Sequence, residues 1–513
     1  MSTNLDKIDE LQRRREVALG GGVGRGRDSH VAAGKMLVRD RLKLLFDDGF
    51  DFEDGLLSGT DRGQPADAVV TCVGKIHGRD VAVIANDMTV KAGSWGLVTL
   101  LKITRMQEVA LEAGIPIVYL IDSAGARVDD QRDCFLGRRS WPNIFYNLSN
   151  SSGIIPQVAA MFGPSPAGAA YIPALCDIVI MVEGKATMMM GSPRMAKMTI
   201  GEDTTEEALG GARMHCSKSG VGDVLVGDEA AAIQSVRDYI GHMPQNWRER
   251  VPVRPAVAPA VGPVPLDEVV PAEQNQPFDV HNLIHGIVDE GSFYAVKDLF
   301  AREMATGFAR LGGMTVGIIA NNSRHKGGVL FVDSADKAAK FTWMCDAFNI
   351  PILFLMDISG YMIGSAAERA GIIRHGAKFV QAVSASRVPR ICVLARKAYS
   401  GGYLAMSGAG THPDATLALP TAMPALVGPE AAVNAVYYTE IMSLPEAERG
   451  AFIQMKREEY ARDIDVFGKA ADEFHVEAVV APSELRQELI SRFRLYSRRE
   501  NRPAERRAMV HPV

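Results

Sequence analysis

The chain has 513 residues, of which 47% are apolar and 23% charged, with a formal net charge of −5. This length and composition predict a globular protein of two or more domains with a large buried core. The slightly acidic balance argues against a nucleic-acid binder, which would carry a basic excess or stripe.

The N-terminal residues, MSTNLDKIDELQRRREVALGGG, are charged and lack the apolar segment of a secretory signal. No stretch approaches the roughly 18 uninterrupted apolar residues that a membrane helix needs. The six cysteines form no C-x-x-C motif, and several lie in apolar runs, which is typical of small buried side chains. We therefore expect no membrane contact, no metal bound by this chain, and a cytoplasmic or organelle-matrix location.

In the first half of the chain, short apolar runs alternate with helical stretches. GRDVAVIAN (78–86), IPIVYLIDSAG (115–125) and residues 158–161 have the length and β-branched content of buried strands. Residues 99–112 have the helical period and directly precede the second of these strands. A glycine-containing turn at 163–169 follows the third strand. This alternation predicts a mostly parallel α/β core.

The second half of the chain repeats the first. GMTVGIIAN (313–321) and IPILFLMDISG (350–360) match the first-half runs at the same offset of 235 residues. A helical stretch at 335–348 and a strand at 391–394 follow in the same order. Pairing Ala167 with the glycine of AYSGGYL at position 401 gives an offset of 234 residues. Three ordered matches in register predict two copies of one domain.

A proline-rich segment separates the two copies. Residues 251–271 contain six prolines and little helix or strand pattern, so they should be extended and semi-rigid. We therefore predict an N-terminal domain at 1–250, a linker at 251–275 and a C-terminal domain at 276–513.

Four turns at the ends of predicted strands hold small residues: 122–125, 163–169, 357–360 and 399–402. Small residues let the backbone approach a ligand closely, and a turn that opens a helix presents free N–H groups. Such donors stabilise a developing oxyanion. One such turn alone would indicate only tight strand-to-helix packing, but the repetition at matching places favours two related ligand sites.

Several segments together resemble the carboxyltransferase (β) subunits of biotin-dependent acyl-CoA carboxylases. They are RDRLKLLFDDGF (39–50), DSAGAR (122–127), GPSPAGAAYIPA (163–174), GEDTTEEALGGARMHCSKSGVGD (201–223), FDVHNLIHGIVDEGSF (278–293), GIIRHGAKFVQAV (371–383) and RKAYSGGYLAM (396–406). The resemblance covers residues 37–497. It implies an α/β fold of two tandem crotonase-like (ClpP-like) domains, in agreement with the duplication.

The resemblance also implies site residues. The first oxyanion pair falls on Ala167 and Gly168, and the second on Gly401 and Gly402. Relatives more often have Gly-Gly at the first pair, so Ala167 departs from the pattern, as does Ser400 beside the second pair. Alanine restricts φ, so we expect Ala167 to act as a donor only at negative φ.

Substrate contacts are implied in the D-x-x-G turns and just after the second glycine pair. These residues are Gly125, Ala126, Gly360, Tyr361 and Leu404.

The implied reaction moves a carboxyl group from carboxybiotin to the α- or γ-carbon of an acyl-CoA through an enolate. One turn would stabilise the enolate oxygen and the other the ureido oxygen of biotin. Biotin itself would take the α-proton, so no catalytic serine, histidine or aspartate is required. Juxtaposition and exclusion of water supply the rest of the rate enhancement.

The chain has no A-M-K-M-type biotin attachment motif and no recognisable ATP-binding carboxylase region. The resemblance therefore implies a separate biotin carboxylase/biotin carrier (α) subunit as partner. It also implies self-association into a homohexamer, a trimer of dimers, with active sites between subunits. The bound small molecules would be carboxybiotin and a coenzyme A thioester.

Other candidate residues favour structural roles. His281 and His285 have i, i+4 spacing, but no HExxH motif and no acidic third ligand accompany them, which argues against a metal site. The basic residues Arg25, Arg27 and Lys35 suit phosphates of CoA, although a solvated surface is the simpler interpretation.

Two alternatives stay open. The chain would have nearly the same fold and sites in a biotin-dependent decarboxylase complex, or it is a non-catalytic scaffold paralogue. The acyl group also stays open: IFYN (144–147) and HCSKSGVGD (215–223) resemble methylcrotonyl-type relatives, whereas RKAY (396–399) resembles acetyl/propionyl-type relatives.

Overall fold

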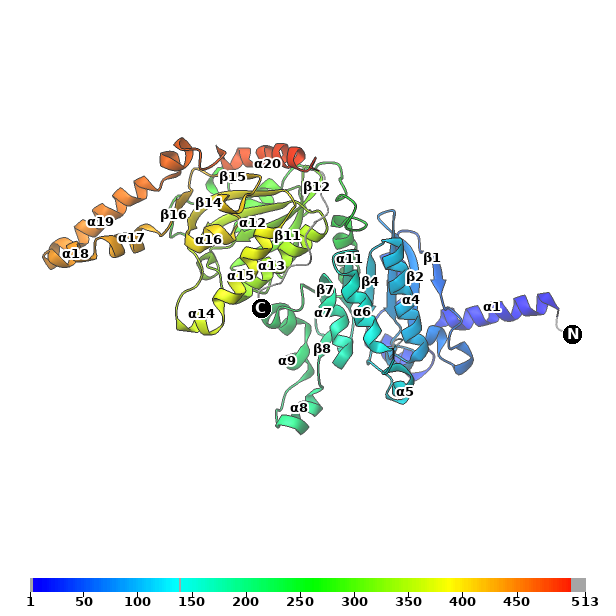
Figure 1. Cartoon of the computed structure of the whole chain (residues 1–513). Coiled ribbons are helices and arrows are strands. Elements are labelled where there is room, and N and C mark those ends of the chain that lie inside the picture. Colours follow the sequence, from blue (N-terminus) through cyan, green and yellow to red (C-terminus); the bar gives the residue numbers. More distant parts are fainter. Residues whose placement is uncertain (1–2, 138–139, 500–513) are drawn as a thin grey trace. The chain divides into compact units, whose positions relative to one another are not determined.

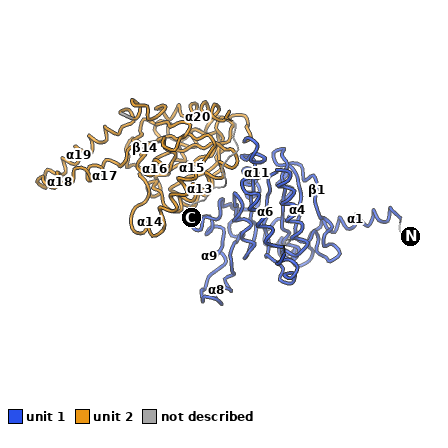
Figure 2. The backbone as a smooth tube through the Cα atoms, viewed as in Figure 1, with its two compact units in different colours: residues 1–250 blue, residues 251–513 orange. Residues whose placement is uncertain are grey.

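The computed structural model describes residues 3–137 and 140–499. The chain divides after Arg250 into two compact units (Figure 2). Each unit contains one large sheet with helices packed against it (Figure 1).

The sheet of the first unit has the strand order β1-β2-β3-β4-β5-β7-β9. Its strands are β1 (Phe50–Asp54), β2 (Val69–Ile76), β3 (Arg79–Asn86), β4 (Ile117–Ile121), β5 (Gln157–Met161), β7 (Ile178–Val182) and β9 (Val224–Val226). The pairs β1–β2 and β2–β3 are antiparallel, and the later pairs are parallel. A small separate sheet pairs β6 (Pro164–Pro166) with β8 (Thr187–Met189).

The sheet of the second unit has the order β10-β11-β12-β13-β14-β15-β17, and β16 pairs with β14. Its strands are β10 (Tyr294–Val296), β11 (Met304–Leu311), β12 (Met314–Asn321), β13 (Ile352–Ile358), β14 (Arg390–Tyr399), β15 (Ala415–Ala418), β16 (Met423–Ala425) and β17 (Ala478–Val479). Again the first two pairs are antiparallel and the others are parallel.

Most strand pairs in each sheet are parallel, as predicted, but each sheet begins with two antiparallel pairs that the sequence pattern did not predict. In each unit a two-residue loop joins two eight-residue strands. The loop residues His77 and Gly78 have φ of 53° and 73°, and Gly312 and Gly313 have 59° and 83°. Two consecutive positive φ angles match the right-handed twist of a hairpin. The strand that precedes each GRDVAVIAN-like run was not recognised in the sequence.

The helices of the first unit are α1 (Asn4–Gly20), α2 (Arg25–Ala32), α3 (Val38–Leu45), α4 (Leu97–Ala113), α5 (Gln131–Cys134), α6 (Trp141–Ser151), α7 (Tyr171–Leu175), α8 (Pro193–Ile200), α9 (Glu206–Gly210), α10 (Ala212–Met214) and α11 (Glu229–His242). Those of the second unit are α12 (Val280–Ile287), α13 (Val332–Ala347), α14 (Ser365–Arg369), α15 (Ile372–Ala385), α16 (Ser400–Ala405), α17 (Pro429–Val436), α18 (Tyr438–Ser443), α19 (Glu446–Asp463) and α20 (Pro482–Tyr496).

Helices pack on both faces of the second sheet, which gives the unit three layers. On one face, apolar residues of α12 and α20 form a buried cluster with alternate residues of β13 and β14, among them Leu353 and Ile391. On the other face, the Phe341 ring of α13 lies 4.9 Å from the Phe308 ring of β11. In the first unit α4 packs on β2 and β3, while α11 packs on β5 and β7.

The proline-rich segment at 251–275 is part of the second unit. Apart from a 3-10 turn at Leu266–Glu268 and an isolated bridge at Val253, it has no regular secondary structure. Its backbone is nevertheless fixed, because Arg254 N–H donates to the Gly313 carbonyl at 3.0 Å and Arg486 donates to the Val257 carbonyl at 2.8 Å. None of the helices within the described ranges is long and apolar enough to cross a membrane.

Candidate active site

A short turn opens a helix at the carboxyl end of a parallel strand in each unit. In the first unit β5 continues through β6 into a 3-10 helix at Ala167–Ala170. In the second unit β14 passes directly into α16. The first N–H groups of a helix have no partner within the helix. Each turn can therefore present backbone donors to a ligand oxygen.

The backbone of the two turns matches with a shift of one residue from the sequence-based pairing. Ala167 and Ser400 both have positive φ, 52° and 54°. Gly168 follows the first and Gly401 follows the second, and the next residue in each turn is buried. Ala167 therefore corresponds to Ser400, not to Gly401.

Ala167 has positive φ, so this turn does not meet the condition of negative φ that the sequence set for a donor role. A left-handed conformation costs an alanine about 1–2 kcal/mol. The N–H is nevertheless retained, since only proline lacks it. Ser400 has the same conformation in the second unit. The backbone strain is therefore a feature of the turn in both units and is not confined to one residue.

Gly402 differs in environment from the other three residues predicted as oxyanion donors. A Cβ on Gly402 would lie 2.9 Å from Ile358, whereas on Gly168 its nearest neighbour would be the Phe145 ring at 4.0 Å. A Cβ on Gly401 would lie 3.4 Å from the Tyr361 ring. The glycine at 402 thus permits close packing of α16 on β13.

The D-x-x-G loops lie directly against the glycine-rich turns. Gly125 has φ of 87°, and a Cβ there would lie 3.3 Å from Pro166. Gly360 has φ of 130°, and a Cβ there would lie 3.9 Å from the Ser400 side chain. The structure therefore brings two predicted substrate contacts next to the predicted donors.

The residues after these glycines occupy matching positions but differ in size. Ala126 forms a bridge with Trp95, and Tyr361 forms the equivalent bridge with Leu330. The Tyr361 hydroxyl donates to the Gly376 carbonyl of α15 at 3.3 Å, and burial raises the pKa of this phenol. Tyr361 thus supports the second turn from the side, while Leu404, 43% exposed, lies on α16 just after it.

A buried carboxylate at the end of β4 anchors the first D-x-x-G loop. Asp122 is fully buried, and Lys35 Nζ donates to its Oδ1 at 2.7 Å. Arg41 donates to its Oδ2 at 3.1 Å and also to Glu229 at 2.8 Å. A Cβ on Gly163 would lie 2.0 Å from Asp122 Oδ1, so the start of the glycine-containing turn packs on this network.

The second unit has its own buried carboxylate, Asp357. Arg396 contacts it with two nitrogens, at 2.8 and 3.2 Å, and both side chains are essentially inaccessible to solvent. The same guanidinium donates to the carbonyls of Glu273 and Gln276, at 2.8 and 2.6 Å. Lys397 Nζ lies 3.7 Å from the carboxylate, and burial lowers the pKa of this lysine.

The sequence pattern did not indicate that these cations pair with the buried aspartates. Lys35 was considered for CoA phosphates or a solvated surface, but its side chain is only 13% exposed and is paired with Asp122. Arg27 donates to the Gly20 carbonyl and is half-buried. The repeated aspartates, Asp122 and Asp357, could have indicated such partners, because a carboxylate at the end of a buried strand needs a cationic partner.

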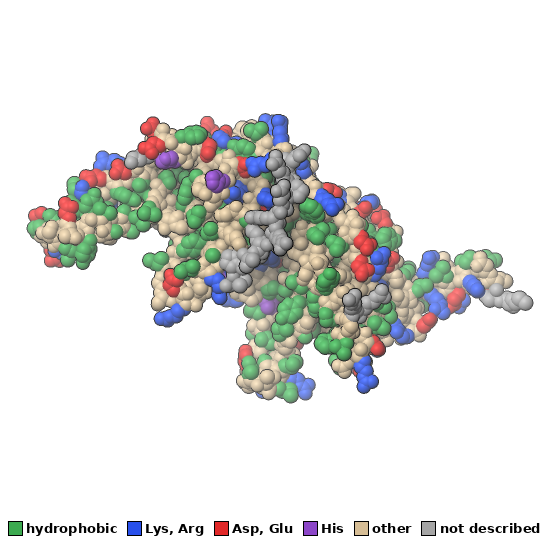
Figure 3. All heavy atoms as spheres, in the orientation of Figure 1, with side chains coloured by type: hydrophobic (Ala, Val, Ile, Leu, Met, Phe, Trp, Pro, Cys, Tyr) green, Lys and Arg blue, Asp and Glu red, His purple; other side chains and the backbone are tan. Residues whose placement is uncertain are grey.

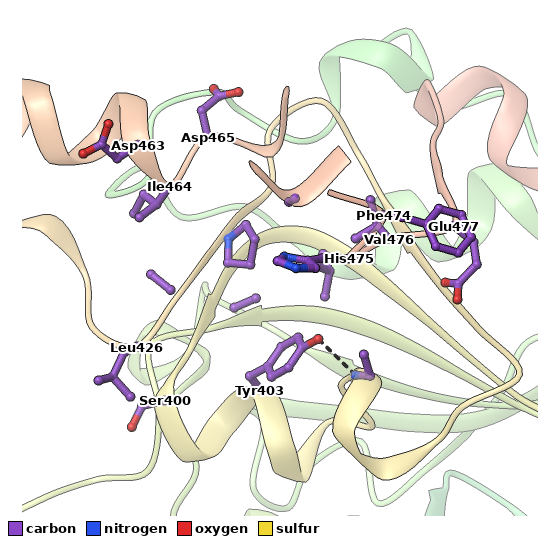
Figure 4. Close-up of a pocket in the computed structure, with 16 residues that line it drawn as sticks. Ser400, Tyr403, Leu426, Asp463, Ile464, Asp465, Phe474, His475, Val476 and Glu477 are labelled. Atoms are coloured by element: carbon purple, nitrogen blue, oxygen red, sulfur yellow. Dashed lines mark hydrogen bonds between the residues drawn. The ribbon is translucent and has the colours of Figure 1, made fainter. Parts of the chain in front are cut away.

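The second turn opens onto a cavity of about 850 Å³ (Figure 4). Ser400 and Tyr403 of α16 lie on one side, and Phe474 and His475 lie on the other. The Tyr403 hydroxyl accepts a hydrogen bond from the Ala409 N–H at 3.0 Å, which fixes the ring. A largely apolar cavity with a few polar groups suits a small organic ligand.

An aromatic pair borders the first turn. The rings of Phe145 and Tyr171 meet edge to face at 6.3 Å, and Phe145 faces Gly168. This pair limits the space beside the predicted donors of the first unit. Across the described ranges, no three His, Cys, Asp or Glu side chains are grouped so that they could hold a metal ion.

Comparison with known protein families assigns the fold and its chemistry. Residues 29–510 match the family model described as the carboxyl transferase domain. The chain belongs to this family. The predicted resemblance is confirmed, and so is the enzyme class, an acyl-CoA carboxyltransferase.

Two named relatives match this chain along nearly its whole length. The carboxyltransferase subunit of propionyl-CoA carboxylase from Haloferax mediterranei is 38% identical, with 98% of this chain and 99% of the relative covered. The α subunit of methylmalonyl-CoA decarboxylase from Propionigenium modestum is 37% identical, with 99% and 100% covered.

A solved structure of the transcarboxylase 12S subunit, with methylmalonyl-coenzyme A and methylmalonic acid bound, also matches. It is 35% identical to this chain, and the match covers 100% of this chain and 99% of the solved chain with a TM-score of 0.92. The predicted α/β fold of crotonase-like type is thereby confirmed.

Proposed function

We propose that this carboxyltransferase moves a carboxyl group between biotin, carried by a partner subunit, and a short acyl-CoA. The observation that carries the proposal is the repeated turn, with matching φ at Ala167 and Ser400 and exposed or half-exposed glycines after them. Two sets of backbone donors suit a reaction in which two oxyanions develop.

In this mechanism the N–H groups of Ala167 and Gly168 hold the thioester oxygen as the enolate forms. The N–H groups of Ser400 and Gly401 hold the ureido oxygen on the other side. We assign Ser400 in place of Gly402 because Gly402 is buried against Ile358. Carboxybiotin, when bound, supplies both the carboxyl group and the base for the α-proton.

Acyl-CoA is assigned to the first unit and biotin to the second. The Phe145–Tyr171 pair beside Gly168 restricts the first site, which favours a short acyl group. The cavity of about 850 Å³ beside Ser400 offers the second site apolar walls for a small bicyclic ring.

We further propose that the chain works as a homohexamer with a biotin carboxylase/carrier subunit as partner. The solved 12S relative forms a hexamer. Helices α17 to α18 expose large apolar side chains, with Val436 at 72%, Tyr438 at 63% and Met442 at 51% (Figure 3). Exposed apolar surface of this kind is typical of subunit contacts.

The test is a decarboxylation assay with malonyl-, methylmalonyl- or 3-methylglutaconyl-CoA and free biotin. We expect biotin-dependent turnover of at least one thioester by the purified protein. Gly168→Val should lower kcat by about 100- to 1,000-fold, because its side chain would block the approach of the thioester oxygen to the N–H donors, with the effect of a lost oxyanion contact. The matched control is Gly227→Val, because a Cβ at Gly227 meets nothing within 4 Å and one at Gly168 meets only the Phe145 ring at 4.0 Å.

The outcomes separate the remaining alternatives. Equal turnover by wild type and Gly168→Val would contradict the assigned donors, and an inactive but correctly assembled wild-type protein would favour the scaffold. The decarboxylase alternative is supported by the relative from Propionigenium modestum. Carboxylation of the acyl-CoA after addition of a biotin carboxylase, ATP and bicarbonate would favour the carboxylase.

A further inference from the structure

A second cavity, of about 430 Å³, lies in the second unit and shares no lining residue with the glycine-rich turns. It is bordered by the start of α12, by β10 and by the loop after β12. Its ionisable lining residues are Asp279, His281, His285, Asp298, Arg302 and His325.

Of the two acidic groups of this cavity, Asp279 already has cationic and donor partners. Asp279 accepts from His281 Nδ1 at 2.7 Å and from Arg324 at 3.3 Å, which with other contacts lowers the pKa of its carboxyl despite burial. Asn322 Nδ2 also donates to it, at 3.4 Å. Asp298, 57% exposed, lies 3.7 Å from His281 Nε2.

The basic groups are in the opposite situation. Within the described chain, the side chains of Arg302, His285 and His325 make no hydrogen bond or ion pair with protein groups. Those of Arg302 and His285 are exposed, and that of His325 is half-buried. A guanidinium has only donors, and an imidazole can donate from a ring nitrogen. Free donors therefore face the cavity while the Asp279 carboxylate is occupied, and that pattern favours an anionic ligand.

Comparison with the first unit shows that these basic side chains are specific to the second unit. Main-chain hydrogen bonds match the two loops residue by residue: Asp87 N–H donates to Ala68 O as Asn322 N–H donates to Glu303 O. By this match Asp67 corresponds to Arg302, and Val90 to His325. Asp87 likewise corresponds to Asn322. The second unit therefore has a cation and an amide in place of two carboxylates, and an imidazole in place of the valine.

The equivalent loop of the first unit is also covered by the chain itself. Gly22 N–H donates to Thr89 Oγ1 at 3.0 Å, and a Cβ on Gly22 would lie 2.1 Å from the Thr89 carbonyl. In the second unit the matching loop borders the cavity. The Phe293 ring, which meets the His285 ring edge to face at 5.7 Å, forms an apolar wall there.

We propose that this cavity binds a phosphate-bearing small molecule, with Arg302 and His325 holding the phosphate and the Phe293 wall contacting the organic part. Its volume is in the range of small-molecule sites and exceeds what inorganic phosphate alone would fill. This proposal does not depend on the assigned donors of the active site.

The test is calorimetric titration of the full-length protein in phosphate-free buffer with inorganic phosphate and, separately, with adenosine 3′,5′-bisphosphate. Two variants install the residue of the first unit, Arg302→Asp and His325→Val. Each should weaken binding at least tenfold. The matched control, Arg15→Asp, makes the same charge change on the exposed surface of α1 and should leave binding unchanged.

The two probes separate the sources of the phosphate. Tighter binding of the nucleotide than of inorganic phosphate, lost in both variants, supports an organic ligand; equal affinity restricts the site to phosphate itself and overturns the role of Phe293. Nucleotide bound at the acyl-CoA site would persist in both variants. No binding to wild type, or binding that neither variant weakens, overturns the proposal.

Discussion

The two units hold the same buried carboxylate with different cations. In the first unit, Asp122 is paired with Lys35 and Arg41, both from the segment before the sheet. In the second, Asp357 is paired mainly with Arg396, which belongs to the neighbouring strand β14. The aspartate and the backbone of its loop are retained in both units, whereas the origin of the compensating charge is not.

Other interior contacts are retained closely. Asn86 and Asn321 each donate to the carbonyl of a glycine seven residues later. Lys102 and Lys337 each place a buried ammonium among backbone carbonyls, including those of Ala66 and Ala301. Contacts that fix the backbone are therefore the same in both units. The charge of the buried aspartate, in contrast, is balanced by cations from different parts of the chain.

The largest difference between the units is expected on removal of one arginine. Arg396→Met leaves Asp357 buried with only Lys397 at 3.7 Å, so we expect the free energy of unfolding of the second unit to fall by about 3–5 kcal/mol. Arg41→Met leaves Asp122 bonded to Lys35 at 2.7 Å and Glu229 paired with Lys185 at 3.5 Å, so its loss should be smaller. Urea unfolding followed by circular dichroism measures both.

The control for this pair is the double variant Arg396→Met with Asp357→Asn, which removes both charges. It should recover part of the lost stability, since the buried carboxylate is gone and Lys397 keeps its hydrogen bond to the Gln274 carbonyl at 3.3 Å. An equal loss of unfolding free energy in Arg396→Met and Arg41→Met would show that the two ion-pair networks stabilise their units equally, which contradicts the prediction.

The buried lysines should give the units different pH dependence. Burial lowers the pKa of Lys337 from 10.5 to about 7 and that of Lys102 to about 8. Between the folded and unfolded pKa the unfolded chain binds more protons, so stability rises with pH. The window is about pH 7 to 10.5 for Lys337 and about 8 to 10.5 for Lys102.

We therefore expect Lys337→Met to flatten the rise in stability between pH 7 and 8, and Lys102→Met to leave it nearly unchanged. Thermal unfolding at fixed ionic strength across this range is the measurement. A wild-type slope that survives in the Lys337 variant would contradict the assignment.

The third difference lies within the second turn. Gly402→Ala places a methyl group 2.9 Å from Ile358, and overpacking of this kind costs about 1–3 kcal/mol. The position that matches it in the first unit is Ala169, which already carries that methyl group. Chemical unfolding should show the loss, and removal of the methyl group by Ala169→Gly should cause no comparable strain.

The smallest effect is expected at the strained residues. Ala167→Gly removes a positive-φ alanine, and the relief of about 1–2 kcal/mol is partly offset by about 0.5–1 kcal/mol of unfolded-state entropy. The variant should be slightly more stable and retain turnover within about threefold, because the N–H is kept. A tenfold loss of decarboxylation would show that the methyl group itself positions the substrate.

The sequence predicted the duplication and most of the parallel strands, because buried runs such as 115–125 and 350–360 carry their own periodicity. It predicted the helices at 99–112 and 335–348 to within a few residues of α4 and α13. It did not predict the leading hairpins, although the two-residue turns His77-Gly78 and Gly312-Gly313 each lie between two strand-length segments.

Within the site, the sequence placed the turns correctly but could not set their register. Ala167 and Ser400 share a positive φ that neither residue type favours, so only coordinates reveal the match. The partners of Asp122 and Asp357 were also hidden, because Lys35 and Arg396 lie at unrelated distances along the chain. His281 and His285 were noticed for metal binding, whereas their neighbour Arg302 was not.

The attachment of the proline-rich segment to the second unit determines where the chain can be divided. Arg396 donates to the carbonyls of Glu273 and Gln276, and Arg486 to that of Val257. A fragment that begins at residue 276 would leave the Arg396 guanidinium, buried beside Asp357, with one backbone acceptor fewer. A split gene that joins the segment to the second half keeps these acceptors, so complementation of two co-expressed halves should succeed with a break after Arg250 and fail with one after residue 275.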